Sequence, residues 1–323
     1  MSVDPVVLAE VTVEAAGGSP VPTGGAPSAP GAPPERPTHS RGRMVVHRFL
    51  RKRMAVAGLV TLVALFVVAF VGPHLSRWGY DQKDFDAFLS PPSARHWFGT
   101  DQTGADLYAQ TLRGMQKSLI IGLLTALIAT GVAAFVGATA GYFGGWVDRA
   151  LMWVVDLLLV LPAFLLLALL SPKFRGRSWL LFVVLLAAFA WMITSRVVRG
   201  MTLSLKEREY VEAARFMGVP AYRIIARHIL PNMSSLLIID ATVNVGVAVI
   251  GEAGLAFFGF GIQPPDISLG TLISDGSVAF LTDSWLFYVP AGVLVLIVLA
   301  VNLVGDGLRD AFDPTATFRQ GSR

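Results

Sequence analysis

Long apolar runs, rather than an alternation of apolar and polar positions, dominate this chain. Six of these runs read as membrane-spanning helices, at about residues 55–72, 118–141, 150–170, 178–195, 233–260 and 284–305. Eighteen residues of α-helix rise about 27 Å, which is close to the ~30 Å hydrocarbon thickness of a bilayer. The pattern therefore predicts an all-α membrane protein with six transmembrane helices and with both termini on the same side.

The composition supports a membrane protein and excludes several other classes. Of the 323 residues, 54% are hydrophobic and 15% charged, and the mean hydropathy is +0.61. Soluble domains carry about a quarter charged residues, so this balance argues against a soluble enzyme. The chain has no cysteine, which excludes disulfides, thiolate metal sites and cysteine nucleophiles.

The basic residues predict the orientation. Six of them lie just before the first run: Arg41, Arg43, Arg48, Arg51, Lys52 and Arg53. With the six spans above, 18 of the 26 Lys and Arg residues fall on the side of the termini, and such an excess is typical of cytoplasmic segments. The short group Lys173, Arg175 and Arg177 falls on the outer side and departs from the rule locally. We therefore expect a multi-pass protein of the plasma (cytoplasmic) membrane with both termini in the cytoplasm.

Four regions follow from the pattern. Residues 1–43 are rich in Pro, Gly and Ala and lack a hydrophobic period, which predicts a disordered cytoplasmic tail rather than a signal peptide. Residues 44–117 hold the first span and an outer loop, and residues 118–314 hold the remaining spans. Residues 315–323 are a short C-terminal tail.

Two connections are too long to be simple turns. The first, residues 73–117, is expected outside the cell and carries the acidic residues Asp81, Asp84, Asp86, Asp101 and Asp106. The second, residues 197–232, is expected in the cytoplasm. Ordered loops of this length are usually functional.

The cytoplasmic connection predicts two short helices. Its first part, from Leu203, sets apolar residues among charges, and Gly218 is placed to end that helix in a left-handed conformation. Pro220 suits the first turn of a second helix, which Leu230-Pro231 is expected to end before the fifth span. An apolar edge among charges, on an element expected to have no partner in its own chain, indicates docking into a groove of another protein. A solvated helix without a partner is the alternative.

This segment resembles the EAA loop of ABC importer permeases. The resemblance rests on Glu212-Ala213-Ala214, on Gly218 four residues later, and on Ile229-Leu230-Pro231. It implies that the loop is a coupling helix seated in a cytoplasmic ATPase. It places the coupling function on Glu212, Ala213, Ala214, Arg215, Gly218, Leu230 and Pro231.

Residues 44–314 resemble one branch more closely, the C-type permease subunit of dipeptide and oligopeptide ABC importers. The residues His96 to Asp106 resemble the outer Gly-Thr-Asp-x-x-Gly-Arg-Asp element of that branch, with Ala105 in place of the Arg. The resemblance assigns docking of an extracytoplasmic binding protein to Gly99, Thr100, Asp101 and Asp106. Further matches are residues 141–148, Glu252, 258–261, 263–265 and 305–310, whereas Leu269-Gly270 departs from the usual Trp-Gly.

Three polar residues within the spans are candidates for the translocation path or its gate: Asp156, Asn244 and Glu252. Charges near the bilayer centre are costly and face the bundle interior or water. Glu252 either borders the path or lies at a water-accessible helix end, bonded to a neighbour's backbone. Asp156 precedes Pro162, where the helix is expected to hinge or simply to kink. Asn244 is expected to hydrogen-bond across helices, and Asp240 to be a solvated or paired boundary charge.

Small residues in the fifth span allow close helix packing, either at a permease dimer interface or within one bundle. They are Ala241, Gly246, Ala248, Gly251, Gly254 and Gly259.

Motifs of enzymes are missing from the sequence. It has no Gly-x-x-x-x-Gly-Lys-Ser/Thr phosphate loop, no His-Glu-x-x-His and no Gly-x-Ser-x-Gly. We therefore expect no catalytic residue, no metal site and no cofactor in this chain.

The resemblance implies an importer subunit of the type I permease architecture for dipeptides or oligopeptides. It implies as partners a second permease subunit in a heterodimer, two ATPase subunits or domains that hold ATP and Mg, and an extracytoplasmic substrate-binding protein. Contact with membrane lipid is expected, and contact with nucleic acid is not. The alternatives are import of nickel or another small solute, an autonomous secondary transporter, for which no internal repeat is found, and an integral membrane enzyme.

Overall fold

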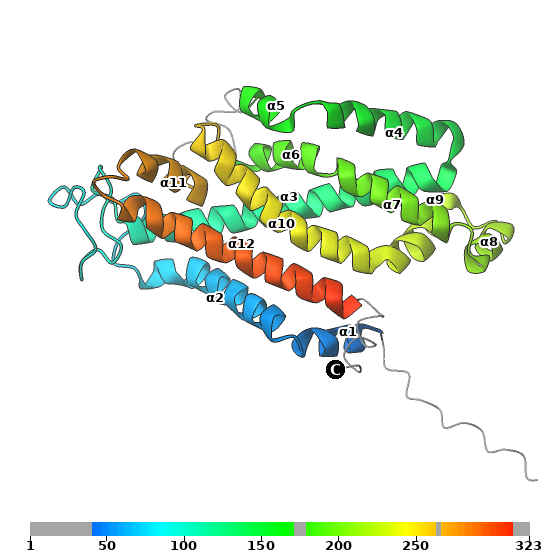
Figure 1. Cartoon of the computed structure of the whole chain (residues 1–323), viewed down its shortest axis with the longest axis horizontal. Helices are drawn as coiled ribbons and strands as arrows, with labels where there is room; N and C mark the ends of the chain where they lie inside the picture. Colours follow the sequence, from blue (N-terminus) through cyan, green and yellow to red (C-terminus); the bar gives the residue numbers. More distant parts are fainter. Residues whose placement is uncertain (1–40, 171–178, 263–265, 313–323) are drawn as a thin grey trace, which may run out of the picture. The chain divides into compact units, whose positions relative to one another are not determined.

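The computed structural model describes residues 41–170, 179–262 and 266–312, all within one compact unit, Ser40–Arg323 (Figure 1). The described residues are built from helices and loops. The extended pairing among them is limited to two isolated bridges, Lys83 with Ala105 and Thr100 with Asp106. The predicted all-α class is confirmed.

Four uninterrupted helical segments are long and apolar enough to cross a membrane. They are α2 (Arg53–Leu75), α3 (Leu107–Phe143), the segment Ala221–Phe257 that ends in α10 (Ser234–Phe257), and α12 (Trp285–Phe312). α3 begins eleven residues before the predicted start of the second span. Asp106 caps it there, because its side chain accepts a hydrogen bond from the backbone N–H of Ala109 at 2.9 Å.

The third predicted span is broken in two. α4 (Gly145–Val160) and α5 (Ala163–Leu170) meet at 77° around Leu161 and Pro162. Proline has no backbone N–H and its ring clashes with the carbonyl of the preceding turn, so the helix cannot continue straight through it. The bend expected at Pro162 is therefore present, and it is sharper than an ordinary kink.

The fourth predicted span is also broken, although it contains no proline. α6 (Trp179–Ala190) and α7 (Met192–Leu205) meet at 49° around Trp191. The indole N–H of Trp191 donates to the carbonyl oxygen of Ala188 at 3.0 Å, so this carbonyl keeps a partner where the ladder is interrupted. Counting each bent pair as one span, the described residues contain the six predicted spans.

Two helices were not predicted. α1 (Arg41–Leu50) precedes the first span, and its Phe49 and Val45 pack with Ala55 and Ala311. The tail predicted over residues 1–43 lies outside the described residues except for its last three, which begin α1. α11 (Leu269–Val278) starts at a capping box formed by Ser268 and Thr271.

α3 is the central helix of the bundle. It contacts α2, α4, α6, α7, α10 and α11. Close approach depends on small residues: a Cβ on Gly141 would lie 2.7 Å from Cβ of Thr202 in α7, and one on Gly122 would lie 2.6 Å from Val249 in α10. Small residues of α3 thus bring it close to α7 and α10, whereas Gly251 and Gly254 of α10 face open space.

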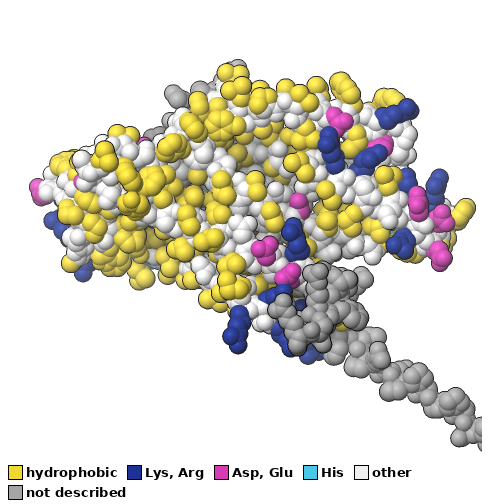
Figure 2. All heavy atoms as spheres, viewed as in Figure 1, with side chains coloured by type: hydrophobic (Ala, Val, Ile, Leu, Met, Phe, Trp, Pro, Cys, Tyr) yellow, Lys and Arg dark blue, Asp and Glu magenta, His cyan; other side chains and the backbone are white. Residues whose placement is uncertain are grey.

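Polar and apolar side chains separate on the surface (Figure 2). Hydrophobic side chains cover the spans, and charged ones gather at α8 (Glu209–Phe216), at the adjoining ends of α4 and α7, and around α1. This distribution is what a bilayer requires of the helices that it surrounds.

Candidate coupling loop and membrane carboxylates

The loop helix α8 ends as the sequence predicts. Gly218 has φ +74°, the N–H of Val219 donates to the carbonyl oxygen of Ala214 at 3.1 Å, and the N–H of Gly218 donates to that of Arg215 at 3.0 Å. These two bonds are the Schellman pattern, which needs a left-handed residue at the position of Gly218. The turn therefore fixes the direction in which the chain leaves α8.

One side of α8 is buried against its own chain, which corrects the expectation of an element without an internal partner. Val211 and Ala214 are each 2% exposed and pack with Ile224, Ile229 and Met233. This contact orients the helix on the end of the bundle, so α8 is attached to the body that contains α7 and α10.

The opposite side of α8 is free. Phe216 is 91% exposed and Met217 75% exposed, and Glu212, Ala213 and Arg215 are exposed beside them. Adjacent large apolar side chains exposed at the tip of a charged element are typical of a surface that contacts another protein. The structure thus brings five of the seven predicted coupling residues together: Glu212, Ala213, Ala214, Arg215 and Gly218.

Leu230 and Pro231 do not end the second loop helix, so this part of the prediction is wrong. α9 (Ala221–Ile224) passes into a π-helical turn (Ile225–Ile229) and a 3₁₀ turn (Leu230–Met233), and the helix then continues as α10. The change of helical pitch accommodates the missing N–H of Pro231. The coupling loop is therefore joined to α10 through continuous helix.

Glu252 is sealed inside the bundle. Its side chain is 0% exposed, and it accepts hydrogen bonds from Oγ of Ser268 at 2.6 Å and from Oγ of Ser118 at 3.5 Å. The N–H of Leu269 donates to the same Ser118 hydroxyl at 3.2 Å. Glu252 thus joins α10 to α3 and to the start of α11. It lies at neither a water-accessible helix end nor an open path, and its partners are hydroxyls rather than backbone groups.

Asp156 and Asn244 have partners that the sequence did not reveal. Asp156 of α4 forms an exposed ion pair with Arg196 of α7. Nearby, Asp148 pairs with Arg199 at 2.5 Å, so two ion pairs connect α4 with α7. Asn244 donates to Asp240 at 2.9 Å within its own helix, which corrects the expected contact between helices.

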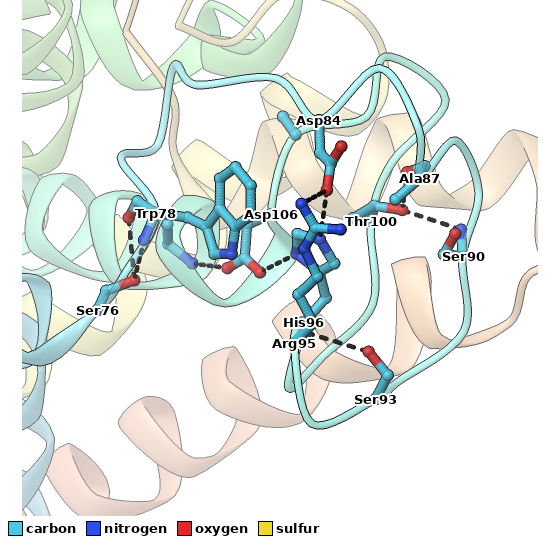
Figure 3. A network of polar contacts seen from close by, with 12 residues as sticks. Ser76, Trp78, Asp84, Ala87, Ser90, Ser93, Arg95, His96, Thr100 and Asp106 are labelled. Carbon is cyan, nitrogen blue, oxygen red and sulfur yellow. Dashed lines mark hydrogen bonds and ion pairs between the residues drawn. The ribbon is translucent and has the colours of Figure 1, made fainter.

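In the long loop between α2 and α3, His96 lies between two buried carboxylates (Figure 3). Its Nδ1 is 2.8 Å from Oδ2 of Asp106, and its Nε2 is 3.3 Å from Oδ2 of Asp84. Arg95 forms an ion pair with Asp84 at 2.9 Å. The pKa of Asp84 is lowered from its ordinary value, chiefly by the hydrogen bond from the backbone N–H of Asp86, with His96 and Arg95 adding to the effect against the cost of burial.

The four residues predicted to dock a binding protein take part in the internal structure of this loop. Thr100 is 0% exposed and accepts from the N–H of Ser90 at 2.9 Å, and Asp101 accepts from Nε2 of Gln110 at 2.9 Å. Gly99 has φ +82° and is also buried, and Asp106 caps α3. Their docking role stays a prediction; Gly99, Thr100 and Asp106 are buried, and Asp101 is half-buried.

Three of the exposed side chains of the same loop are aromatic. Phe85 is 72% exposed, Trp97 58% and Phe88 52%. These three were not among the predicted site residues, although aromatic residues in an otherwise polar outer loop are a recognisable signal.

Comparisons with known proteins agree with this architecture. Residues 106–317 match the model of the family described as binding-protein-dependent transport system inner membrane component. The chain therefore belongs to that family of multi-pass inner-membrane permease components. Residues 40–92 match the N-terminal transmembrane domain of oligopeptide transport permease C, so both the general family and the branch suggested by the motifs are confirmed.

Named relatives cover nearly the whole chain. The oligopeptide transport system permease protein OppC of Mycobacterium tuberculosis is 57% identical over 286 residues, which are 88% of this chain and 98% of that protein. The dipeptide transport system permease protein DppC of Bacillus subtilis is 37% identical over 282 residues, 87% of this chain and 88% of that protein. A chain of the solved MetNI methionine ABC transporter matches with 20% identity and a TM-score of 0.49, over 63% of this chain and 97% of that chain.

Proposed function

We propose that this chain is one permease subunit of an ATP-driven importer of dipeptides or oligopeptides. The cargo is inferred from the names of the relatives, which are an oligopeptide and a dipeptide permease matched over almost their full lengths. A second permease subunit completes the channel, and an extracytoplasmic binding protein delivers the peptide. ATP and Mg are held by two ATPase subunits or domains, and this chain holds no cofactor.

The observation that carries the coupling part is the free face of α8. Phe216 and Met217 are exposed on an element whose other side is anchored by Val211 and Ala214. A helix that is anchored on one face and free on the other can transmit a push from a docked ATPase into α7 and α10. This assignment puts α8 and both termini in the cytoplasm, in agreement with the excess of basic residues on that side.

Alternating access follows from the same arrangement. Closure of the two ATPases on ATP moves α8, and the helices attached to it rearrange so that the channel opens outward. The chain itself performs no chemistry in this cycle, because hydrolysis takes place on the partners.

Import of nickel or another small solute on the same architecture is the alternative. The relatives named above favour peptides, and the described residues contain no group of three or more His, Cys, Asp or Glu side chains that could hold a metal ion.

Gentle purification of the tagged full-length chain from its native membrane, followed by mass spectrometry, tests the assembly. A second permease and ATPase subunits are expected to accompany it. The purified complex, reconstituted in vesicles with its binding protein, is expected to accumulate peptide only with ATP. A chain that is recovered alone and moves solute without ATP contradicts the proposal and favours an autonomous transporter.

A further inference from the structure

A carboxylate in α10 is held in place by hydroxyl and amide groups alone. Oδ1 of Asp240 accepts a hydrogen bond from Oγ1 of Thr194 in α7 at 2.7 Å. Oδ2 accepts from Oγ1 of Thr130 in α3 and from Nδ2 of Asn244, each at 2.9 Å. Donors from three helices therefore orient this side chain, which is half-buried.

Four other carboxylates of the described part of the chain have a basic partner, whereas Asp275 of α11 and Asp306 of α12 form no ion pair. Asp148 pairs with Arg199, Asp156 with Arg196, Asp266 with Lys117 and Asp310 with Lys52. Within the described part of the chain, no Lys, Arg or His forms an ion pair with Asp240. Glu252 also lacks one, but Glu252 is sealed from any ligand. Asp240 is thus a half-buried carboxylate without an ion-pair partner among the described residues.

The face of α10 that carries Asp240 is uncovered in this chain. Steps of seven, four and seven residues lead from Asp240 to Val247, Gly251 and Phe258, so all four lie on one face of the helix. Val247 is 57% exposed and Phe258 63% exposed, and a Cβ on Gly251 would meet nothing within 4 Å. A carboxylate turned toward lipid is costly, which indicates that this face borders protein or a water-filled passage.

We propose that Asp240 is a cation-binding site on the translocation path, where it attracts the positively charged groups of the peptide cargo. The inference rests on the proposed peptide-import function and adds a residue and a charge preference to it. The ligand class is an ammonium or guanidinium group, from a lysine or arginine side chain or from the peptide amino terminus.

The hydrogen bonds explain why such a site suits transport. The two threonines and Asn244 fix the carboxylate direction before any cargo arrives, so little ordering is needed when a cation binds. Their hydrogen bonds also offset part of the negative charge on the carboxylate oxygens, so a cation is held less tightly. A site on a path must bind well enough for entry and weakly enough for release.

The test compares three peptides in vesicles that contain the complete complex and a saturating amount of binding protein. The peptides are Ala-Lys-Ala, Ala-Ala-Ala and Ala-Glu-Ala, and the initial rate of ATP-dependent uptake is measured for wild type and Asp240→Asn. Asp240→Asn is expected to lower uptake of Ala-Lys-Ala about fivefold and that of Ala-Glu-Ala less than about twofold, with Ala-Ala-Ala in between. The binding protein is the same in both samples, so its own preferences cancel in the ratio.

Two further variants make the test specific. Asp156→Asn removes a carboxylate that already has Arg196 as its partner, and it is expected to change all three rates by one common factor. Asp240→Glu keeps the charge and is expected to keep the wild-type order of the three peptides.

Equal losses for all three peptides in Asp240→Asn overturn the inference, because the carboxylate would then serve a fixed partner such as a basic residue of the second permease. Failure of Asp240→Asn to assemble, together with equal losses for the three peptides in Asp240→Glu, overturns it as well. Wild-type vesicles that take up none of the peptides overturn the proposed function, and with it this inference. The two failures are therefore distinguishable.

Discussion

The N–H of Val219 reaches back across Gly218 to the carbonyl oxygen of Ala214, at 3.1 Å. This bond closes α8 and directs the chain toward α9. It exists because Gly218 adopts φ +74°, a conformation that costs residues with a Cβ about 1 kcal/mol or more. The exposed tip formed by Phe216 and Met217 is therefore positioned by one glycine.

Substitution of Gly218 is expected to uncouple the transporter. Gly218→Pro removes both the left-handed conformation and an N–H donor, so ATP-dependent uptake is expected to be lost, whereas Gly218→Ala is expected to reduce it several-fold. Uptake in vesicles and the amount of membrane-inserted chain are the two measurements. Undiminished uptake by Gly218→Pro contradicts the role of this turn.

Reversal of charge at Glu212 is expected to abolish transport without loss of the fold. The side chain of Glu212 is exposed, so Glu212→Arg alters what α8 presents to a partner and not how the chain packs. Co-purification of the ATPase with the tagged variant measures the effect. Normal recovery of the ATPase together with normal uptake would show that Glu212 lies outside the contact.

Phe216 and Val211 form a matched pair of test positions on one helix. Phe216→Ser is expected to leave the thermal stability of the chain in detergent unchanged and to weaken ATPase binding, because Phe216 is 91% exposed. Val211→Ala is expected to lower the free energy of unfolding by about 1–2 kcal/mol, because Val211 is 2% exposed and packs with Ile224 and Ile229. Equal stability losses in both variants contradict the assignment of the two faces.

Glu252 is expected to be a structural residue. Glu252→Leu leaves the hydroxyls of Ser118 and Ser268 without their acceptor inside the bundle. The free energy of unfolding is therefore expected to fall by about 1–3 kcal/mol. Glu252→Gln keeps an acceptor oxygen and is expected to lose less stability than Glu252→Leu. Thermal unfolding of both variants in detergent tests this order, and an equal or larger loss in Glu252→Gln runs against it.

The outer loop is expected to loosen in acid. The pKa of Asp84 is below its ordinary value of 3.8 in the folded chain. Its carboxylate therefore stabilises the loop above about pH 4, and this contribution is lost as the pH falls through the lowered pKa. Proteolysis between residues 76 and 106, followed from pH 6 to pH 3, is expected to accelerate only at the acid end, and to vary less with pH in Asp84→Asn. Cleavage that is equally pH-dependent in Asp84→Asn assigns the effect to other groups.

The spans could be predicted from the sequence because charge-poor apolar runs of bilayer length are characteristic of transmembrane helices. The early start of α3 could not be predicted, because Arg113 and Lys117 interrupt the apolar run there. In the structure Lys117 is nevertheless buried. Lys117 pairs with Asp266, a residue 149 positions away in the sequence, and no local pattern shows this. α11 was not predicted because it is a short helix of ten residues, several of which are polar.

The candidate functional residues, too, could be predicted only in part from the sequence. Gly218 could be predicted from the sequence because a helix end is local chemistry, set by a few neighbouring residues. The environment of Asp240 depends on Thr130 and Thr194, which lie 110 and 46 residues away. The sequence marks such a residue as unusual within an apolar run, and only the packing of three helices shows what surrounds it.

The break at Trp191 divides the fourth span into two mechanical units. α7 is joined to α4 by Asp148–Arg199 and Asp156–Arg196 and leads within a few residues to α8, whereas α6 packs with α5 and with the N-terminal half of α3. In the importer proposed above, a displacement of α8 is expected to pass to α7 and, through the two ion pairs, to α4, and the bends at Trp191 and Pro162 separate these helices from α6 and α5. Movement at the α8 end of the bundle then need not open the opposite end, so the two ends of the proposed passage need not be open together.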